Sequence, residues 1–244
     1  MSGHSKWANI KHKKEKTDAQ RGKIFTKIGR ELSIAVRSGG PDPAVNTKLA
    51  DVIAKAKANN MPNETISRSI KKAAGEGDAA NYEELTYEGY GPAGVAVILE
   101  ILTDNRNRTA GEMRHIFDKA GGSMGATGCV GWMFDKKGVI VIERTPDTDE
   151  DELTMQAIEA GAEDITPQDD AFEIYTSPEE FSSVRKALED AGYVFLSAEI
   201  DRIPQTTVSV DDEALKKVNW MLDMFEDNDD VQNVFHNALL PEEE

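Results

Sequence analysis

The sequence contains a single cysteine, Cys129, and only four histidines in 244 residues. One cysteine excludes an internal disulfide and any zinc site built from several cysteines, and it agrees with a reducing compartment. The histidines do not show the HExxH spacing of a zinc hydrolase. The acidic run EDNDDVQ lacks the glycine and the terminal glutamate of a calcium-binding loop. We therefore expect no metal site.

Long apolar runs are also missing. The longest, GVAVILEIL at residues 94–102, is interrupted by a glutamate and is far shorter than the roughly 20 residues of a membrane-spanning helix. The basic N-terminus has no apolar segment behind it and so does not resemble a secretory signal. We expect a soluble, cytoplasmic protein without a membrane partner.

The motifs of common enzyme classes are absent as well. No GxxxxGK[ST] phosphate-binding loop occurs, and the glycine-rich stretch AGGSMGATG precedes a strand pattern, whereas a dinucleotide fingerprint follows one. We interpret that stretch as a turn-forming segment and not as a phosphate-binding loop. Cys129 lies in an apolar pattern, which indicates a buried structural thiol more than a nucleophile. The sequence thus predicts no catalytic residue and no cofactor.

Positive charge is scarce overall but concentrated at one end. The net charge is −17, yet residues 1–80 hold 16 Lys or Arg against 8 carboxylates, while residues 81–244 hold 12 against 37. Such an asymmetry favours a basic module that meets a polyanion, attached to an acidic body that resists non-specific association.

Apolar residues recur every three or four positions through residues 20–36, 45–56 and 66–73, which predicts three amphipathic helices. Glycines and prolines separate the segments, and Gly75 and Gly77 close the third. On the first helix the cations lie opposite the apolar stripe; they are Lys23, Lys27, Arg30 and Arg37. We predict an all-helical N-terminal domain over residues 1–79.

The period changes to two after this domain, which indicates strands. Alternation at Val95–Ile101 predicts a strand, Thr109 with Glu112 predicts a capping box that starts a helix, and CVGWMF at residues 129–134 predicts another strand. Residues 138–203 follow the order β-α-β-β-α-β. Ser177, Pro178 and Glu180 predict the start of its second helix.

The segment TTVSV, the helix after it and DVQNVF complete a second unit of the same kind. We therefore predict a multi-domain α/β (α+β) fold: the three-helix domain is followed by two ferredoxin-like split-βαβ domains, one inserted in the other. The predicted discontinuous domain comprises residues 80–137 plus 204–244, and the inserted domain comprises residues 138–203.

The basic N-terminus is the first candidate site. Its cations can neutralise phosphates; they are Lys6, Lys11, His12, Lys13, Lys14, Lys16, Arg21, Lys23, Lys27 and Arg30. Trp7 lies among them and has two interpretations. Its ring either stacks on an unpaired base or holds the extended N-terminus against the helices, and we favour the second.

The second candidate site is DNRNRT, comprising Asn105, Arg106, Asn107, Arg108 and Thr109 after Asp104. The two arginines lie between a strand and the N-terminus of a helix, where backbone N–H groups favour anions. Alternatively, this is a polar loop whose arginines pair with nearby carboxylates.

Taken together, GHSKWANIKHKK, RGKIFTK, YEGYGP, DNRNRT and DDVQNVFHN resemble the YebC/PmpR family over nearly the whole chain. The resemblance implies a helical domain followed by two α/β domains, with the third inserted in the second. It implies DNA-binding transcriptional regulation or ribosome-associated help with translation. It also implies nucleic-acid contacts at Lys6, Trp7, Lys11, Lys13, Lys14, Arg21, Lys23 and Lys27, and a functional loop at residues 105–109.

Our main hypothesis is a non-enzymatic, nucleic-acid-binding regulator of gene expression that contacts phosphates through its basic N-terminal domain. Charge does not separate DNA from ribosomal RNA, and we lean to RNA because the acidic body suits a site that offers protein as well as phosphate. Two alternatives stay open: an enzyme with an anion site at Arg106 and Arg108 beside Asp104, and a purely protein-binding adaptor. We expect a monomer.

Overall fold

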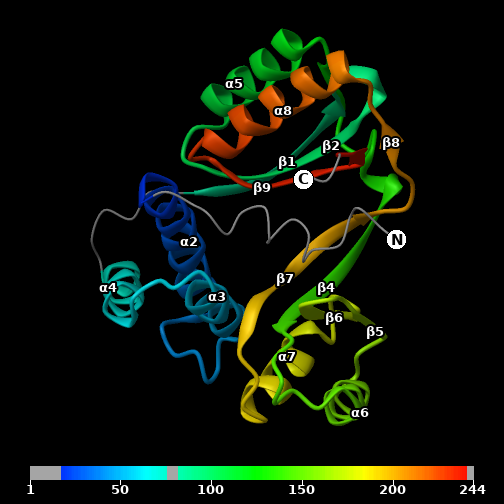
Figure 1. The fold of residues 1–244 in the computed structure, drawn as a ribbon. Coiled ribbons are helices and arrows are strands. Elements are labelled where there is room, and N and C mark those ends of the chain that lie inside the picture. The colour runs from blue at the N-terminus through cyan, green and yellow to red at the C-terminus, as the bar shows by residue number, and fades with distance from the viewer. Residues whose placement is uncertain (1–17, 76–81, 241–244) are drawn as a thin grey trace. The chain divides into compact units, whose positions relative to one another are not determined.

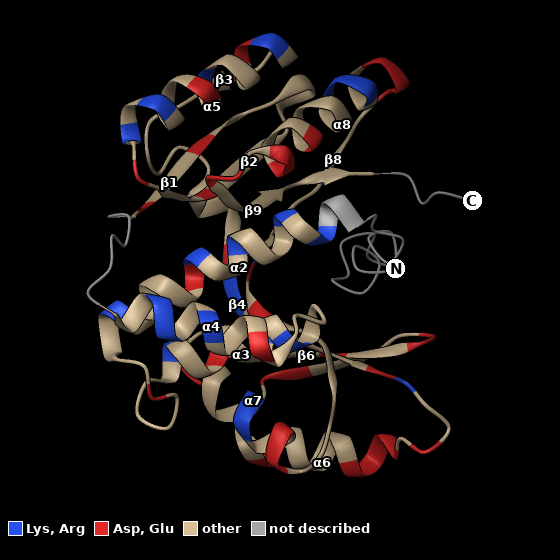
Figure 2. Cartoon of the chain, turned by 90° about the vertical axis from the view of Figure 1, so that its left-hand side faces the viewer, with Lys and Arg blue, Asp and Glu red and all other residues tan. Residues whose placement is uncertain are grey.

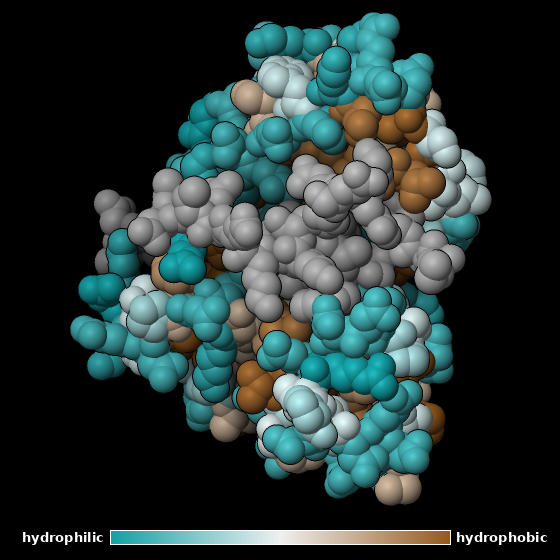
Figure 3. All heavy atoms as spheres, viewed as in Figure 1, coloured by the Kyte–Doolittle hydropathy of each residue, from teal (hydrophilic) through white to brown (hydrophobic). Residues whose placement is uncertain are grey.

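The computed structural model describes residues 18–75 and 82–240. The described residues form two compact units; one combines 82–135 with 202–240, and the other combines 18–75 with 136–201. No helix within the described ranges combines the length and the hydropathy that crossing a bilayer requires. On the face drawn in Figure 3, hydrophilic residues cover most of the surface that these ranges form.

Three helices make up the N-terminal part of the described chain, as the apolar periodicity predicts (Figure 1). They are α2 (Asp18–Gly39), α3 (Thr47–Ala58) and α4 (Asn63–Ala74). Their apolar stripes meet in one core, in which Ile28, Leu32 and Leu49 are almost completely buried. Isolated helices of this length are only marginally stable, and burial of the apolar stripes in the shared core stabilises them. The predicted end of the third helix at Gly75 is confirmed.

A buried asparagine fixes the turn between α2 and α3. The Asn46 side chain accepts a hydrogen bond from the Leu49 amide at 3.1 Å and so caps α3. Its amide group also donates to the carbonyl oxygens of Ala35 at 2.7 Å and Gly40 at 2.8 Å. One side chain thereby supplies hydrogen-bond partners to backbone groups at the start of α3 and at the end of α2.

The same unit contains a four-stranded sheet with two helices. Its elements are β4 (Phe134–Glu143), α6 (Glu150–Ala160), β5 (Asp164–Pro167), β6 (Ala171–Thr176), α7 (Phe181–Asp190) and β7 (Phe195–Pro204). The strand order is β5-β6-β4-β7, and β6 pairs antiparallel with both of its neighbours. The alternating apolar residues of β4 and β6 pack with α6 and α7 into one core. The predicted element order β-α-β-β-α-β is present.

The predicted start of α7 is wrong by several residues. The helix begins at Phe181, not next to Ser177. The Ser177 hydroxyl does accept a hydrogen bond from the Glu180 amide at 3.2 Å, but this bond closes a turn that precedes the helix. The sequence signal for a cap is therefore real, and it marks the turn before the helix.

An ion-paired arginine joins α7 to α3 within this unit. Arg185, which is 3% exposed, donates to Asp51 at 2.8 Å and to Glu189 at 2.6 Å. Ser182 donates to the second oxygen of Asp51. The helical domain and the inserted sheet therefore share a hydrogen-bonded contact.

The other unit is built around a second antiparallel sheet, ordered β3-β1-β2-β9. Its elements are β1 (Glu83–Tyr90), η1 (Pro92–Gly94), β2 (Ala96–Thr103), α5 (Arg106–Ala120), β3 (Ser123–Met124), η2 (Gly131–Met133), β8 (Val208–Ser209), α8 (Asp212–Asp227), β9 (Val231–His236) and β10 (Ala238–Leu239). Helices α5 and α8 lie side by side on one face of the sheet (Figure 1). Val97, Leu99 and Ile101 of β2 pack against them, as period-two alternation requires.

One strand prediction for this unit is wrong, and a second predicted strand lies in a different sheet from the one expected. Residues 129–134 form a loop and the short 3₁₀ helix η2, and only Phe134 belongs to a strand, β4. The strand predicted in TTVSV is present as the short strand β8 at residues 208–209, but it pairs with β10 in a separate two-stranded sheet and not with the sheet that contains β9. The unpredicted strand β1 instead pairs with β2 along its full length. The assignment of both sheets to the split-βαβ class, and the three-domain boundaries, stay predictions.

The expectation for Cys129 is also corrected. This residue is partly exposed and lies in the loop before η2, not in a strand. Its side chain packs beside Val130 and Phe134 on the second face of the sheet. Burial, followed by the negative charge of Glu88, raises the pKa of the thiol, which disfavours the thiolate.

A buried carboxylate holds this loop in place. Glu88 on β1 is 5% exposed and accepts three backbone hydrogen bonds, from Gly128 at 2.9 Å, Val130 at 2.8 Å and Gly131 at 2.7 Å. Burial by itself raises the pKa of Glu88, but the three N–H groups outweigh burial and the net pKa is lowered. The charged form is therefore the one that the fold stabilises.

We expect Glu88→Gln to lower the free energy of unfolding at pH 7 by about 1 to 3 kcal/mol, because one amide oxygen cannot satisfy three donors. A lowered folded-state pKa contributes stability above the unfolded value of 4.5, and that stability is lost as the pH falls through the folded value. The difference between wild type and variant therefore shrinks below about pH 4. Urea unfolding at pH 7 and pH 3.5 measures it, with the exposed Glu83→Gln as control. A difference that is constant over this range contradicts the prediction.

Candidate nucleic-acid interface

Four of the predicted phosphate-contacting residues lie on α2, namely Arg21, Lys23, Lys27 and Arg30. Arg21 is exposed, and the other three are partly buried. The buried residues of the helix, such as Ile28 and Leu32, lie on its apolar side and enter the core. Figure 2 shows these cations as blue segments along α2. The core residues and the predicted phosphate-contacting residues thus occupy different sides of one helix.

The remaining predicted residues lie outside the described residues. They are Lys6, Trp7, Lys11, His12, Lys13, Lys14 and Lys16. Their contact with nucleic acid, and both interpretations of Trp7, stay predictions.

The second candidate site lies at the start of α5, and the expected cap there is wrong. Helix α5 begins at Arg106, and its N-cap is Asn105, whose side chain accepts a hydrogen bond from the Arg108 amide at 3.1 Å. Thr109 belongs to the first turn and is buried. An asparagine caps a helix as well as a threonine does, and here Thr109 has buried partners of its own.

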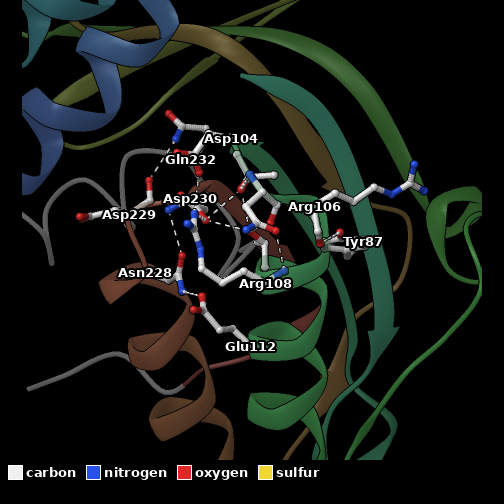
Figure 4. Close-up of polar contacts among 12 residues, drawn as sticks. Tyr87, Asp104, Arg106, Arg108, Glu112, Asn228, Asp229, Asp230 and Gln232 are labelled. Carbon is white, nitrogen blue, oxygen red and sulfur yellow. Dashed lines mark hydrogen bonds and ion pairs between the residues drawn. The ribbon is translucent and has the colours of Figure 1, made fainter. Parts of the chain in front are cut away.

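Those partners centre on Asp230, which is 5% exposed and lies just before β9. One of its carboxylate oxygens accepts hydrogen bonds from Arg108 at 2.8 Å, Thr109 at 2.8 Å and Thr103 at 3.1 Å. The two threonine hydroxyls also lie 2.7 Å apart. This network joins the end of β2, the first turn of α5 and the segment before β9 (Figure 4).

The two arginines of the site differ in their surroundings. Arg108 donates to Asp104 at 2.9 Å as well as to Asp230, and these bonds raise its pKa, with Asp230 the larger cause. Arg108 is therefore permanently charged and engaged by carboxylates. Arg106 is exposed, and Figure 4 shows its side chain extending away from Asp230.

Tyr87 on β1 lies beside the exposed arginine, and its hydroxyl donates to the Arg106 backbone carbonyl at 3.4 Å. Burial raises the pKa of Tyr87, although the positive charges of Arg106 and Arg114 act in the opposite direction. Tyr87 is therefore neutral at pH 7 and serves as a hydrogen-bond donor.

The Asp230 network holds the end of β2, the start of α5 and the segment before β9 together. Arg106 and Asn107 are exposed to solvent. Two surface hollows are lined by described residues, one on α4 and one of about 270 Å³ between α5 and α8. Neither is lined by Arg106 or Arg108. Among the residues that the structure describes, no cluster of His, Cys, Asp or Glu could hold a metal ion.

Sequence reasoning missed Asp230 as the partner of DNRNRT. The only available signal was its position in the acidic run DNDDVQ, where nothing distinguishes one aspartate from the next. Residues 104 and 230 come together only because β2 and β9 are neighbours in the sheet.

The comparisons with known proteins cover almost the entire chain. Residues 5–76 match the model of the TACO1/YebC protein N-terminal domain, and residues 82–238 match the model of the TACO1/YebC second and third domain. The chain belongs to the TACO1/YebC family. Helices α2 to α4 thus lie in the family's N-terminal domain, and both sheets lie within the matched second and third domains.

Its TACO1/YebC relatives carry a regulatory description. A probable transcriptional regulatory protein of Acetivibrio thermocellus is 66% identical over 97% of this chain and 98% of its own length. One from Clostridium tetani is 60% identical over 100% of this chain and 99% of its own length. A conserved hypothetical protein from Aquifex aeolicus, known from a crystal structure, has 48% sequence identity to this chain. The two structures match with a TM-score of 0.80 over 93% of this chain and 94% of that chain.

Proposed function

We propose that this chain is a non-enzymatic, nucleic-acid-binding regulator of gene expression that contacts phosphates through its helical N-terminal domain. The observation that carries the proposal is the charge split: residues 1–80 have twice as many cations as carboxylates in a chain of net charge −17. Phosphate neutralisation with counterion release is the general source of affinity for nucleic acids. The cations on α2 lie away from the apolar stripe of the helix, which forms the core.

The relatives favour a role at DNA. Full-length relatives at 60% to 66% identity are named probable transcriptional regulatory proteins. A transcriptional regulator acts where the chromosome is, and we accordingly propose duplex DNA as the first partner and the cytoplasm as the location.

Ribosomal RNA is the second candidate partner. The carboxylates outnumber the cations 37 to 12 beyond residue 80, so a bare duplex is attracted by one end of the chain and repelled by the rest. A ribosomal site offers protein surfaces to the acidic part and phosphate to the basic part. This role would make the chain a ribosome-associated translation factor.

An enzyme or a protein-binding adaptor is less well supported. Arg108 already pairs with Asp104 and Asp230, which leaves Arg106 as the single outward arginine of the proposed anion site. An adaptor role predicts that removing cations from α2 leaves the activity of the chain unchanged.

The test compares the double variant Lys23→Gln/Lys27→Gln with wild type. We expect it to weaken binding to a labelled 30-base-pair duplex and to make the slope of log K against log salt less negative by about 1.8, because each lost phosphate contact removes about 0.9. Fluorescence anisotropy at several salt concentrations measures both quantities. Ribosome co-sedimentation of the same proteins tests the second partner.

The matched control is Lys136→Gln/Lys216→Gln, which removes two exposed lysines outside the helical domain. Equal slopes for the control and the α2 variant would contradict the proposal. Co-sedimentation with ribosomes that is lost in the α2 variant, together with weak duplex binding, would favour ribosomal RNA over DNA.

A further inference from the structure

Helix α4 has a second cationic face that faces solvent. Its apolar residues Ile66 and Ile70 enter the helical core. Arg68, Lys71 and Lys72 are exposed. At 100° per residue, these cations lie within an arc of roughly 100°, on the opposite side from the apolar stripe. The helix therefore presents three positive side chains together.

These three cations have no carboxylate partner among the described residues. The lysines of α3 behave differently: Lys55 pairs with Glu31 at 2.9 Å, and Lys57 pairs with Glu189 at 3.8 Å. A chain with 45 carboxylates can neutralise exposed cations easily. Arg68, Lys71 and Lys72 nevertheless stay unpaired among the described residues, and they lie within five residues of one helix.

An open hollow of about 630 Å³ lies along this face and is lined by Glu64, Ser67, Arg68, Lys71 and Lys72. Four of the five lining side chains are hydrogen-bond donors at neutral pH, and three of them carry positive charge. Glu64 is the one negative group, and it lies near the N-terminal end of α4. Cβ atoms three and four residues apart on a helix are about 5 to 6 Å from each other. Three long side chains at this spacing can reach neighbouring phosphates of one strand.

We propose that the α4 cationic face, defined as Ser67, Arg68, Lys71 and Lys72, is a second phosphate-binding surface of the helical domain. The proposal rests on the proposed function, since it takes the same ligand, a nucleic-acid backbone. It adds a site that does not depend on the cations of residues 6–30. The surface contacts phosphates by charge and hydroxyl donation, which fixes position and not base sequence.

A purely structural role makes a different prediction. Lys71 and Lys72 lie in the last turn of α4, where cations interact favourably with the helix dipole by about 0.3 to 1 kcal/mol. Removing them for this reason alone lowers stability slightly and does not change the salt dependence of binding. The two roles are therefore separated by measuring both quantities.

The test uses the full chain with Lys71→Gln/Lys72→Gln, and separately with Arg68→Gln. We expect the slope of log K against log salt for a 30-base-pair duplex to become less negative by about 1.8 in the double variant and by about 0.9 in the single variant. The Lys136→Gln/Lys216→Gln control should keep the wild-type slope. Thermal unfolding, followed by circular dichroism, checks that each variant folds. A single-stranded RNA of 30 nucleotides serves as the second probe.

The outcomes distinguish this inference from the proposed function. If the α2 variant makes the slope less negative and the α4 variants match the control on both probes, the α4 surface is overturned and the proposed function stands. If wild type binds neither probe with a salt-dependent affinity, both fail. A lower melting temperature with an unchanged slope also overturns the inference, because it assigns Lys71 and Lys72 to the helix end alone.

Discussion

Between about 50 and 200 mM salt, the affinity of the full chain for nucleic acid is expected to fall by about 10³- to 10⁵-fold. The reason is counterion release, since neutralising about six to ten phosphates gives a slope near −0.9 per contact for duplex DNA. The 16 cations of residues 1–80 are sufficient for that number. Equilibrium titration of one labelled duplex at five salt concentrations measures the slope directly.

A matched titration identifies where the slope originates. The α2 and α4 variants should each make the slope less negative, and their effects should add, because they remove separate phosphate contacts. The Lys136→Gln/Lys216→Gln protein should reproduce the wild-type line. A flat salt response of the wild type would remove the electrostatic basis of the proposed function, whatever the affinity at low salt.

The second large effect concerns the stability of the Asp230 network. Arg108→Ala should lower the free energy of unfolding by about 2 to 3 kcal/mol, because it leaves the buried Asp230 carboxylate without its cation. The value lies below the range for fully buried pairs, since the Arg108 side chain is 44% exposed and water replaces part of the interaction. Urea unfolding monitored by circular dichroism measures it.

Arg106→Ala is the matched control for this prediction. Arg106 lies two residues away in the same turn of α5, but its side chain extends to solvent, so its removal should change stability by less than about 0.5 kcal/mol. A double-mutant cycle with Asp230→Ala should give a coupling energy for Arg108 of about 1 to 3 kcal/mol. Equal effects of the two arginine variants would mean that the network does not stabilise the fold as its geometry indicates.

The helices were predictable because their signal is local. The apolar spacing of residues 20–36, 45–56 and 66–73 repeats at the helical period, and each segment folds as a helix whose stripe enters one core. The alternation in β2, β4 and β6 is equally local, since one face of each strand packs against helices. These elements follow from patterns that a single segment carries.

The errors occurred where a local signal competes with distant partners. Residues 129–134 are apolar enough for a strand, but Glu88 from β1 binds the amides of Gly128, Val130 and Gly131 and holds them in a loop. Thr109 has the spacing of a capping residue, but Asp230 engages its hydroxyl. In both cases a carboxylate distant in sequence decides the local conformation.

The amino-acid sequence by itself determined the charge asymmetry, the helical domain and the resemblance that places the chain in the TACO1/YebC family. Only the tertiary structure separated Arg108, which a buried aspartate engages, from Arg106, which faces solvent. It also showed that Arg68, Lys71 and Lys72 of α4 share one surface on which, among the described residues, they have no carboxylate partner. The physical reason is that charge and periodicity are properties of a segment, whereas the partners of a charged side chain depend on which distant segments the fold brings into contact.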